Sequence, residues 1–171
     1  MLLHCATLTE ARPLIEALHL RKVYQKPFAL FQSDTHRLVV SGIGTIHTAA
    51  ALGWALGQRS EPVLNIGYAT GMEVGQVYNI KKVIDRCTHK VYHLEASVTL
   101  PNAVCETHPK PLTTPTSHLA DMEASAVVAT AKVFRTPCTI VKIVSDRFNP
   151  EELRRDDRLI QKQIGSILSL L

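Results

Sequence analysis

The chain has 171 residues, of which 46% are hydrophobic and 20% are charged, the balance of a soluble globular protein rather than of a disordered or fibrous one. We predict a single domain over residues 1–171, because this length suffices for one full core and is too short for two. The net charge of +4 is scattered along the chain, and aromatic residues make up only 5%. We therefore disfavour nucleic-acid binding, which usually needs a concentrated basic face or stacking aromatics.

The cysteine pattern and the N-terminal residues point to the inside of the cell. Cys5, Cys87, Cys105 and Cys138 form no CxxC pair and lie far apart, which favours free thiols over a disulfide framework or a zinc site. The N-terminal residues lack the basic segment and apolar core of a signal peptide. No apolar run approaches the about 18 residues that a membrane span needs. We expect a cytoplasmic protein with no membrane partner.

The first part of the chain predicts alternating strands and helices, because apolar runs switch repeatedly to helical spacing. A strand over 2–6 precedes a helix that carries Glu10, Leu14, Ile15 and Leu18. Strands over 27–32 and 37–41, joined by a turn at Ser33-Asp34, resemble a hairpin. The sequence then predicts a Gly-Ile-Gly turn over 42–44 and an alanine-rich helix over 46–56.

The second part continues the alternation. An apolar strand over 63–66 enters a glycine-marked turn over 67–71, and strands follow over 77–85 and 91–99. Residues 101–118 hold four of the nine prolines, which predicts a loop. A helix over 121–134, with Asp121 as N-cap, leads to a strand over 138–144. A final helix would align Leu153, Ile160, Ile164, Ile167 and Leu171 on one stripe.

Continuous apolar strands interleaved with helices predict an α/β sheet that is covered on both faces. The ligand crevice of such a sheet lies outside the carboxyl ends of its strands. Four segments follow predicted strand ends, at 6–10, 41–44, 65–71 and 145–146. Glycines there let backbone amides approach a ligand, although a tight turn alone also explains the Gly-Ile-Gly sequence.

Three acidic residues near these ends are candidates for catalysis. Asp146 follows an apolar strand, where a carboxyl group must be paired, hydrogen-bonded or protonated. Its alternative role is to cap a helix that begins near Pro150. Glu123 has small and apolar neighbours in the sequence, which is unusual for a surface glutamate. The alternative to a catalytic role is that Glu123 only interacts favourably with the helix dipole. Glu10 lies just beyond the first strand and is otherwise an exposed helix residue.

Three segments carry a resemblance to a known family. VVSGIGTIHTAAAL, VLNIGYATGMEVGQV and ADMEASAVVATAKVFRTPCTIVKIVSD resemble, in order and spacing, the nucleoside phosphorylase/nucleosidase superfamily, especially the methylthioadenosine/S-adenosylhomocysteine nucleosidases. The resemblance covers most of this shortened chain except the proline-rich stretch over 100–118. It implies a three-layer α/β/α fold with a mixed central sheet, and cleavage of the N-glycosidic bond between a purine and ribose without a cofactor.

The resemblance also implies roles for individual residues. Asp146 would act as general acid at purine N7, with Ser145 orienting it. Glu123 would bind the ribose hydroxyls, Met122 would pack against the sugar, and Glu10 would position and deprotonate the attacking water. This division of labour parallels the two carboxyl groups of glycoside hydrolysis, with Glu10 at an exposed rim and Asp146 at a buried strand end. The predicted substrate-binding residues are Gly44, Ala69, Met122, Glu123 and Ser145.

Other readings stay open from the sequence. Phosphorylases of the superfamily usually carry a phosphate-binding arginine where this chain has Asn65, and a neutral amide cannot replace the guanidinium fork, which favours water as nucleophile. A phosphate-dependent phosphorylase and an inactive nucleoside-binding relative are the alternatives. His89 and His93 are spaced four apart on a predicted strand, a poor match to ligand geometry, so we predict no metal. We expect a homo-oligomer, with a dimer as first choice.

Overall fold

The computed structural model describes residues 1–96, 99–149, 151 and 158–171. The strands are β1 (Leu2–Cys5), β2 (Arg21–Tyr24), β3 (Ala29–Gln32), β4 (Arg37–Val40), β5 (Val63–Thr70), β6 (Val77–Asp85), β7 (Val91–His93), β8 (Asn102–Thr107), β9 (Leu119–Asp121) and β10 (Cys138–Asp146). The helices are α1 (Leu8–Ala17), α2 (Thr45–Gln58), α3 (Ala124–Val133), α4 (Arg158–Lys162) and α5 (Ile164–Leu168).

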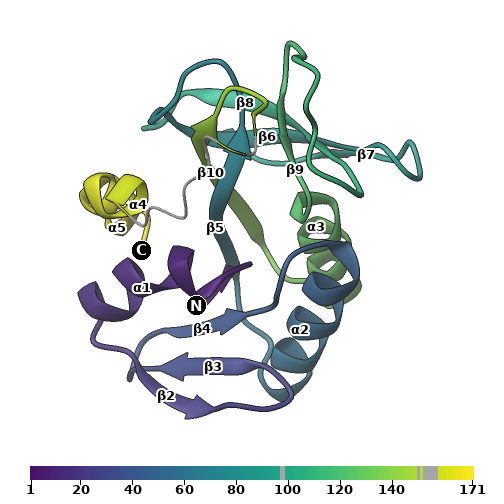
Figure 1. Ribbon diagram of the computed structural model, residues 1–171. Coiled ribbons are helices and arrows are strands. Elements are labelled where there is room, and N and C mark those ends of the chain that lie inside the picture. Colours follow the sequence, from purple (N-terminus) through teal and green to yellow (C-terminus); the bar gives the residue numbers. More distant parts are fainter. Residues whose placement is uncertain (97–98, 150, 152–157) are drawn as a thin grey trace.

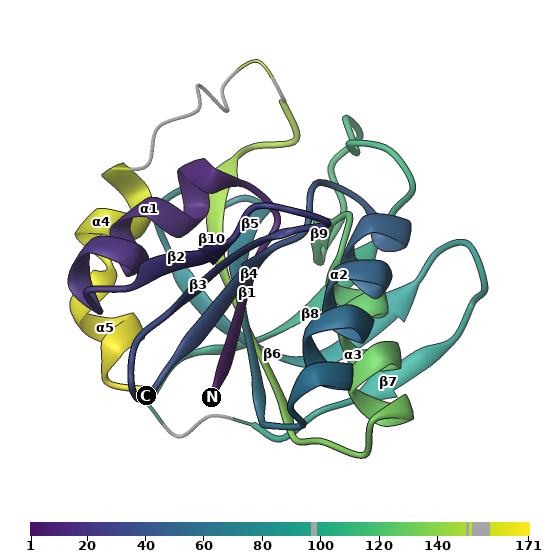
Figure 2. The same ribbon diagram turned by 90° about the horizontal axis from the view of Figure 1, so that it is seen from below.

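One mixed sheet runs through the structure, with helices on both of its faces (Figures 1 and 2). The strand order is β10-β6-β8-β9-β5-β1-β4-β3-β2, and β7 pairs with β6. Because β10 also pairs with β5, the strands β5, β10, β6, β8 and β9 close into a ring, from which the other strands extend. Helices α2 and α3 cover one face, and α1, α4 and α5 lie on the other (Figure 2). The predicted three-layer α/β/α fold with a mixed sheet is confirmed.

Four neighbouring strands create the edge where a site can form. β4, β1, β5 and β10 run parallel to one another, so their carboxyl ends meet on the same side of the sheet. Separate hydrophobic clusters fix the two helix layers against the sheet, with Leu52 and Val127 in one and Leu14 and Ile160 in the other. Fully burying such a side chain contributes about 1.5–3 kcal/mol.

The strands differ from the prediction in several places. The predicted turn over 67–71 is wrong, because β10 pairs with β5 as far as Thr70 and keeps it extended. The predicted loop over 101–118 contains β8, since the proline-free stretch Asn102–Thr107 pairs with β6. The strand predicted over 91–99 is only β7, and residues 97–98 lie outside the described residues. The exposed strand β2 was not predicted.

The helices follow the prediction more closely, with two corrections. Helix α3 begins at Ala124 with Glu123 as its N-cap residue, whereas Asp121 ends β9. The predicted final helix is divided into α4 and α5, in which Ile160 and Ile167 are fully buried. Leu153, the first residue of the predicted stripe, lies outside the described residues.

The helices and the cysteines were also compared with the expectations from the sequence. Among the described residues, no helix has the length and apolar character needed to cross a membrane. The four cysteines are all unpaired, and Cys5 and Cys105 are buried.

Candidate active site

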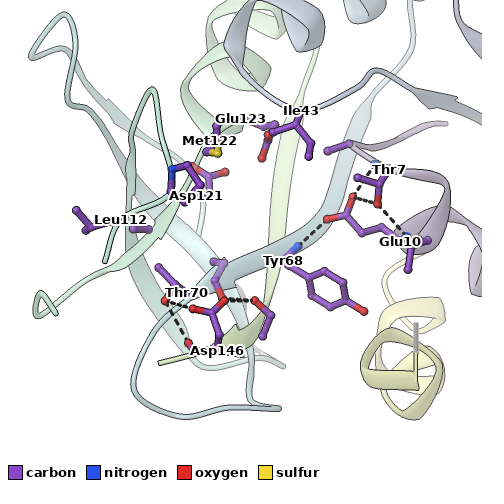
Figure 3. Close-up of a pocket in the computed structure, with 16 residues that line it drawn as sticks. Thr7, Glu10, Ile43, Tyr68, Thr70, Leu112, Asp121, Met122, Glu123 and Asp146 are labelled. Carbon is purple, nitrogen blue, oxygen red and sulfur yellow. Dashed lines mark hydrogen bonds between the residues drawn. The ribbon is translucent and has the colours of Figure 1, made fainter. Parts of the chain in front are cut away.

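A cavity of about 450 Å³ lies at the carboxyl ends of the parallel strands (Figure 3). Four carboxyl groups line it, from Glu10, Asp121, Glu123 and Asp146. No lysine, arginine or histidine stands among the described residues of its lining. Figure 3 shows Glu10, Glu123 and Asp146 entering the cavity from different sides. Such a concentration of carboxyl groups favours positive charge inside the cavity.

Glu10 is held by a local motif and by one distant strand. Thr7 is the N-cap of α1, and its backbone N–H and its hydroxyl donate to Glu10 Oε2 at 2.7 and 3.0 Å. The Glu10 N–H donates back to Thr7 Oγ1 at 3.2 Å, which completes a capping box. The Tyr68 N–H donates to Glu10 Oε1 at 3.0 Å. Only 6% of Glu10 is exposed, so both the exposed-helix alternative and the predicted exposed rim are wrong.

A glycine of β5 makes room for two charged groups. A methyl group at Gly67 would lie 3.1 Å from Glu10 Oε1 and 3.5 Å from Lys142 Nζ. The absence of a side chain at Gly67 therefore lets the carboxylate and the ammonium approach the same part of the strand. Lys142 itself is only 1% exposed, and it is the one polar residue between Ile140 and Val144 in β10.

Lys142 forms a buried ion pair with Asp121, at 2.8 Å between Nζ and Oδ2. The Thr107 hydroxyl donates to the other Asp121 oxygen at 2.8 Å, and the Ala124 N–H donates to Oδ2 at 2.8 Å. Asp121 thus caps the first turn of α3 from the preceding strand. Burial opposes the charge of Lys142, but the charges of Asp121 and Glu123 raise its pKa above the ordinary value, so the ammonium persists.

Glu123 connects α3 to the glycine turn after β4. The Gly44 N–H donates to Glu123 Oε1 at 2.8 Å, and Gly44 has a φ of 98°, in the region that favours glycine. Burial, followed by the neighbouring charge of Asp121, raises the pKa of Glu123 to about 7, although Lys142 and the Gly44 N–H act in the opposite direction. Glu123 therefore changes its charge near neutral pH.

Asp146 has hydrogen bonds to both carboxyl oxygens. The Ser145 hydroxyl donates to Oδ2 at 2.7 Å, and the Thr70 hydroxyl donates to Oδ1 at 2.7 Å. The Asn149 N–H also donates to Oδ1, at 3.1 Å. The alternative role of Asp146, as the cap of a helix that begins near Pro150, falls on residues outside the described ones. The two hydroxyl groups orient the carboxyl group at the cavity. Only 5% of Asp146 is exposed.

The predicted site residues divide into two groups. Six of them line the cavity: Glu10, Ala69, Met122, Glu123, Ser145 and Asp146. Gly44 is not part of the lining and contacts it through Glu123. Asn65 also lies outside the lining, where its side-chain N–H donates to His4 Nδ1 at 2.9 Å. His4 can accept this bond because burial, aided by Lys142, lowers its pKa to about 3 and keeps the ring neutral.

Several residues of the site were missed by the sequence reasoning, although two of them had a recognisable signal. A single lysine in the apolar run CTIVKIV indicated a buried cation at Lys142. The sequence TLTE, from Thr7 to Glu10, has the spacing of a capping box. Thr70 had no local signal, because its partner Asp146 is distant in the sequence. Asp121 was predicted only as a helix cap, because its partners Lys142 and Thr107 are distant or lie in a strand that was predicted as a loop.

The histidines that the sequence offered as metal ligands lie apart from the cavity lining. Within the part of the chain that the structure describes, no group of three or more His, Cys, Asp or Glu residues is arranged to hold an ion. His89 and His93 lie in the turn before β7 and at its end, and neither lines the cavity.

Neither the family models nor the curated proteins match this chain by sequence. Solved structures do match it over nearly its whole length. The 5'-methylthioadenosine nucleosidase of Arabidopsis thaliana has a TM-score of 0.87 and 14% identity, covering 99% of this chain and 94% of that one. The 5'-methylthioadenosine/S-adenosylhomocysteine nucleosidase of Neisseria meningitidis has a TM-score of 0.82 and 18% identity, covering 99% and 98%. The chain has the fold of these nucleosidases.

A third structure adds information about a ligand. The methylthioadenosine/S-adenosylhomocysteine nucleosidase of Colwellia psychrerythraea 34H, solved in complex with adenine, has a TM-score of 0.79 and 15% identity, covering 96% of this chain and 93% of that one. The Neisseria meningitidis protein was solved in complex with methylthio-immucillin-A. At these identities the likeness establishes the fold.

Proposed function

We propose that this protein hydrolyses the N-glycosidic bond of a purine nucleoside. The observation that carries the proposal is that Glu10, Glu123 and Asp146, from three separate segments, line one cavity. The fold is shared with proteins solved in complex with adenine and with methylthio-immucillin-A, which supports a nucleoside as ligand. The candidate substrates include 5'-modified nucleosides of the methylthioadenosine/S-adenosylhomocysteine or futalosine type.

In the proposed mechanism, the bond between the sugar C1' and the purine N9 breaks while Asp146 donates a proton to N7. The base then leaves as a neutral molecule, and the ribose becomes an oxocarbenium-like cation. Glu10 takes a proton from the water that attacks C1'. Its carboxylate is already oriented by Thr7 and Tyr68, which limits the reorganisation needed during the reaction.

The sugar would bind near Glu123, whose carboxyl group can accept hydrogen bonds from the ribose hydroxyls. Met122 lines the same part of the cavity and would pack against the ribose. Ser145 would orient Asp146 through the hydrogen bond to Oδ2. Glu10 and the Asp146 carboxylate left after proton transfer would stabilise the positive charge that develops on the sugar, whereas the charge of Asp121 is already offset by Lys142.

Water is favoured over phosphate as the nucleophile. A phosphate ion would meet four carboxyl groups, and the described lining offers it no basic side chain. Lys142, whose ammonium lies beside the same glycine of β5 as the Glu10 carboxyl group, is already paired with Asp121. Asn65 lies outside the cavity lining, so its neutral side chain bears less directly on the choice of nucleophile.

The test is incubation with a panel of purine nucleosides, with and without phosphate, and measurement of free base by chromatography. We expect release of base without phosphate, and a loss of about 100-fold or more in kcat for Asp146→Asn and Glu10→Gln. Glu16→Gln, on the exposed side of the same helix as Glu10, is the matched control and should keep full activity. Release that requires phosphate would establish a phosphorylase instead. Binding of a nucleoside without turnover would favour the inactive relative.

We also propose a cytoplasmic homo-oligomer, with a dimer as first choice. Ile43, in the turn before α2 and at the edge of the cavity, and Ile46, in the first turn of α2, are 56% and 82% exposed. Exposed apolar residues that lie close together are typical of protein interfaces. Light scattering coupled to gel filtration would measure the mass, and a monomer at all concentrations would contradict this part of the proposal.

A further inference from the structure

The strand pairing next to Asp146 is irregular in a way that affects the site. Along β5 and β10, Val144 pairs with Ala69, but the next pair joins Asp146 to Thr70, so Ser145 is an extra residue in β10. A bulge of this kind redirects the side chains that follow it. Asp146 consequently lies directly across from Thr70, with its carboxyl group at the cavity (Figure 3).

The Thr70 hydroxyl has three neighbours that together define its role. It lies 2.7 Å from Asp146 Oδ1 and 3.2 Å from the Asp146 backbone carbonyl, and both are acceptors for its single hydrogen. The Phe148 N–H donates to the same hydroxyl oxygen. The oxygen is therefore fixed in place from the protein side, while its hydrogen can point to either acceptor.

Ser145 has the same pair of acceptors on the other side of the carboxyl group. Its hydroxyl lies 2.7 Å from Asp146 Oδ2 and 3.3 Å from the Ala69 backbone carbonyl. Each carboxyl oxygen of Asp146 thus has its own hydroxyl group, and each hydroxyl group has a backbone carbonyl as a second acceptor. Such an arrangement can satisfy the carboxyl group both with and without its proton.

We propose that Thr70 is a second positioning residue for Asp146, which acts together with Ser145 as the carboxyl group changes its charge. This inference rests on the proposed role of Asp146 as general acid. While Asp146 holds its proton, the hydroxyl hydrogens point to the backbone carbonyls. When the proton passes to N7 of the purine, the hydroxyl hydrogens rotate to the carboxylate oxygens. The new negative charge gains two hydrogen bonds at the moment it forms, and no atom other than hydrogen has to move.

Asp146 and the substrate account for every proton and electron pair in this step. The proton leaves a carboxyl oxygen of Asp146 and forms a bond to N7, and the electron pair of the broken C1'–N9 bond remains on the purine. The hydroxyl groups of Thr70 and Ser145 keep their own protons throughout. Thr70 therefore acts on the reaction through Asp146, without contact to the substrate being required.

The test compares Thr70→Val, which keeps the shape but removes the hydroxyl group, with Thr70→Ser, which keeps the hydroxyl group. We expect Thr70→Val to lower kcat about tenfold or more and to change KM less than about twofold, because only the transition state uses the bond. Thr70→Ser should retain most of the wild-type kcat. Thr139→Val, an exposed threonine in the same sheet, is the matched control and should behave as wild type.

A second measurement separates positioning from a general structural effect. In a protein that already carries Asp146→Asn, Thr70→Val should cost little further activity, since the group on which Thr70 acts is gone. If Thr70→Val turns over like wild type, or Thr70→Ser is as impaired as Thr70→Val, the inference is wrong while the proposed function stands. If the wild type releases no base from any nucleoside, the proposed function fails and this inference fails with it.

Discussion

Replacing Glu123 by glutamine measures how much free energy of folding is lost when this buried side chain becomes negatively charged. In the folded protein the pKa of Glu123 is raised from 4.5 to about 7, chiefly by burial and by Asp121. The folded state therefore binds the proton more tightly than the unfolded chain does. The stability that this proton contributes is complete below pH 4.5 and is lost as the pH rises through about 7. Glutamine keeps an oxygen for the Gly44 N–H but does not titrate.

The size of the effect follows from the two pKa values. The difference between 4.5 and about 7, at about 1.4 kcal/mol for each pH unit, amounts to about 3 kcal/mol. We expect the free energy of unfolding of the wild type to fall by about this amount relative to Glu123→Gln between about pH 4 and about pH 8.5. Titrations of groups that do not interact with Glu123 cancel in this comparison, because both proteins share them.

The assay is urea unfolding at both pH values, followed by the fluorescence of Trp54, the only tryptophan of the chain. Trp54 packs against the rings of Tyr24 and Phe28, so unfolding changes its surroundings. Glu16→Gln, which replaces an exposed glutamate, should show no such pH dependence. If the wild type and Glu123→Gln differ by the same free energy at both pH values, Glu123 is not destabilised by its charge and the electrostatic account of the site is wrong.

Three other substitutions test neighbouring parts of the site. Lys142→Met should lower the free energy of unfolding by about 3–5 kcal/mol, because it leaves Asp121 charged and buried without its partner; adding Asp121→Asn should restore part of the loss in urea unfolding. Gly67→Ala should lower kcat about tenfold while the unfolding midpoint changes little, since the new methyl group lies 3.1 Å from an oxygen of Glu10; an unchanged kcat would contradict this. The contact with Arg86 is the main reason that the pKa of Glu106 is lowered to about 2, and Glu106→Gln weakens this contact. The variant should therefore be less stable by about 2 kcal/mol at pH 7. In the same assay this difference should disappear as the pH falls from 4.5 towards 2.

Local patterns in the chain predicted most of the elements correctly. The helical spacing of apolar residues, together with the residues at each end of that spacing, correctly predicted α1, α2 and α3, because a helix depends on contacts between residues three or four apart. The hairpin of β3 and β4 was also predicted correctly, because a short turn joins its two strands and the pairing is local. The strands β8, β9 and the second half of β5, which the prediction missed or ended too early, pair with segments that are distant in the sequence or were predicted as loop. Strand β2 was missed although it pairs with the adjacent β3, because all four of its residues are exposed and its sequence shows no buried apolar face.

The type of each candidate residue was readable in advance, whereas its surroundings were not. Glu10, Glu123 and Asp146 could be selected as acidic residues next to strand ends, and the order of the elements was enough to suggest an α/β sheet. Their burial, the proton affinity of Glu123 and the two hydroxyl groups on Asp146 come from long-range pairing. The alternation of side chains along a strand indicates which face of the sheet each one lies on, but it does not indicate which other strand lies beside it. The ion pair of Lys142 with Asp121 joins β10 to β9, both of which pair with β5. The pairing of Thr70 with Asp146 depends in addition on the extra residue in β10.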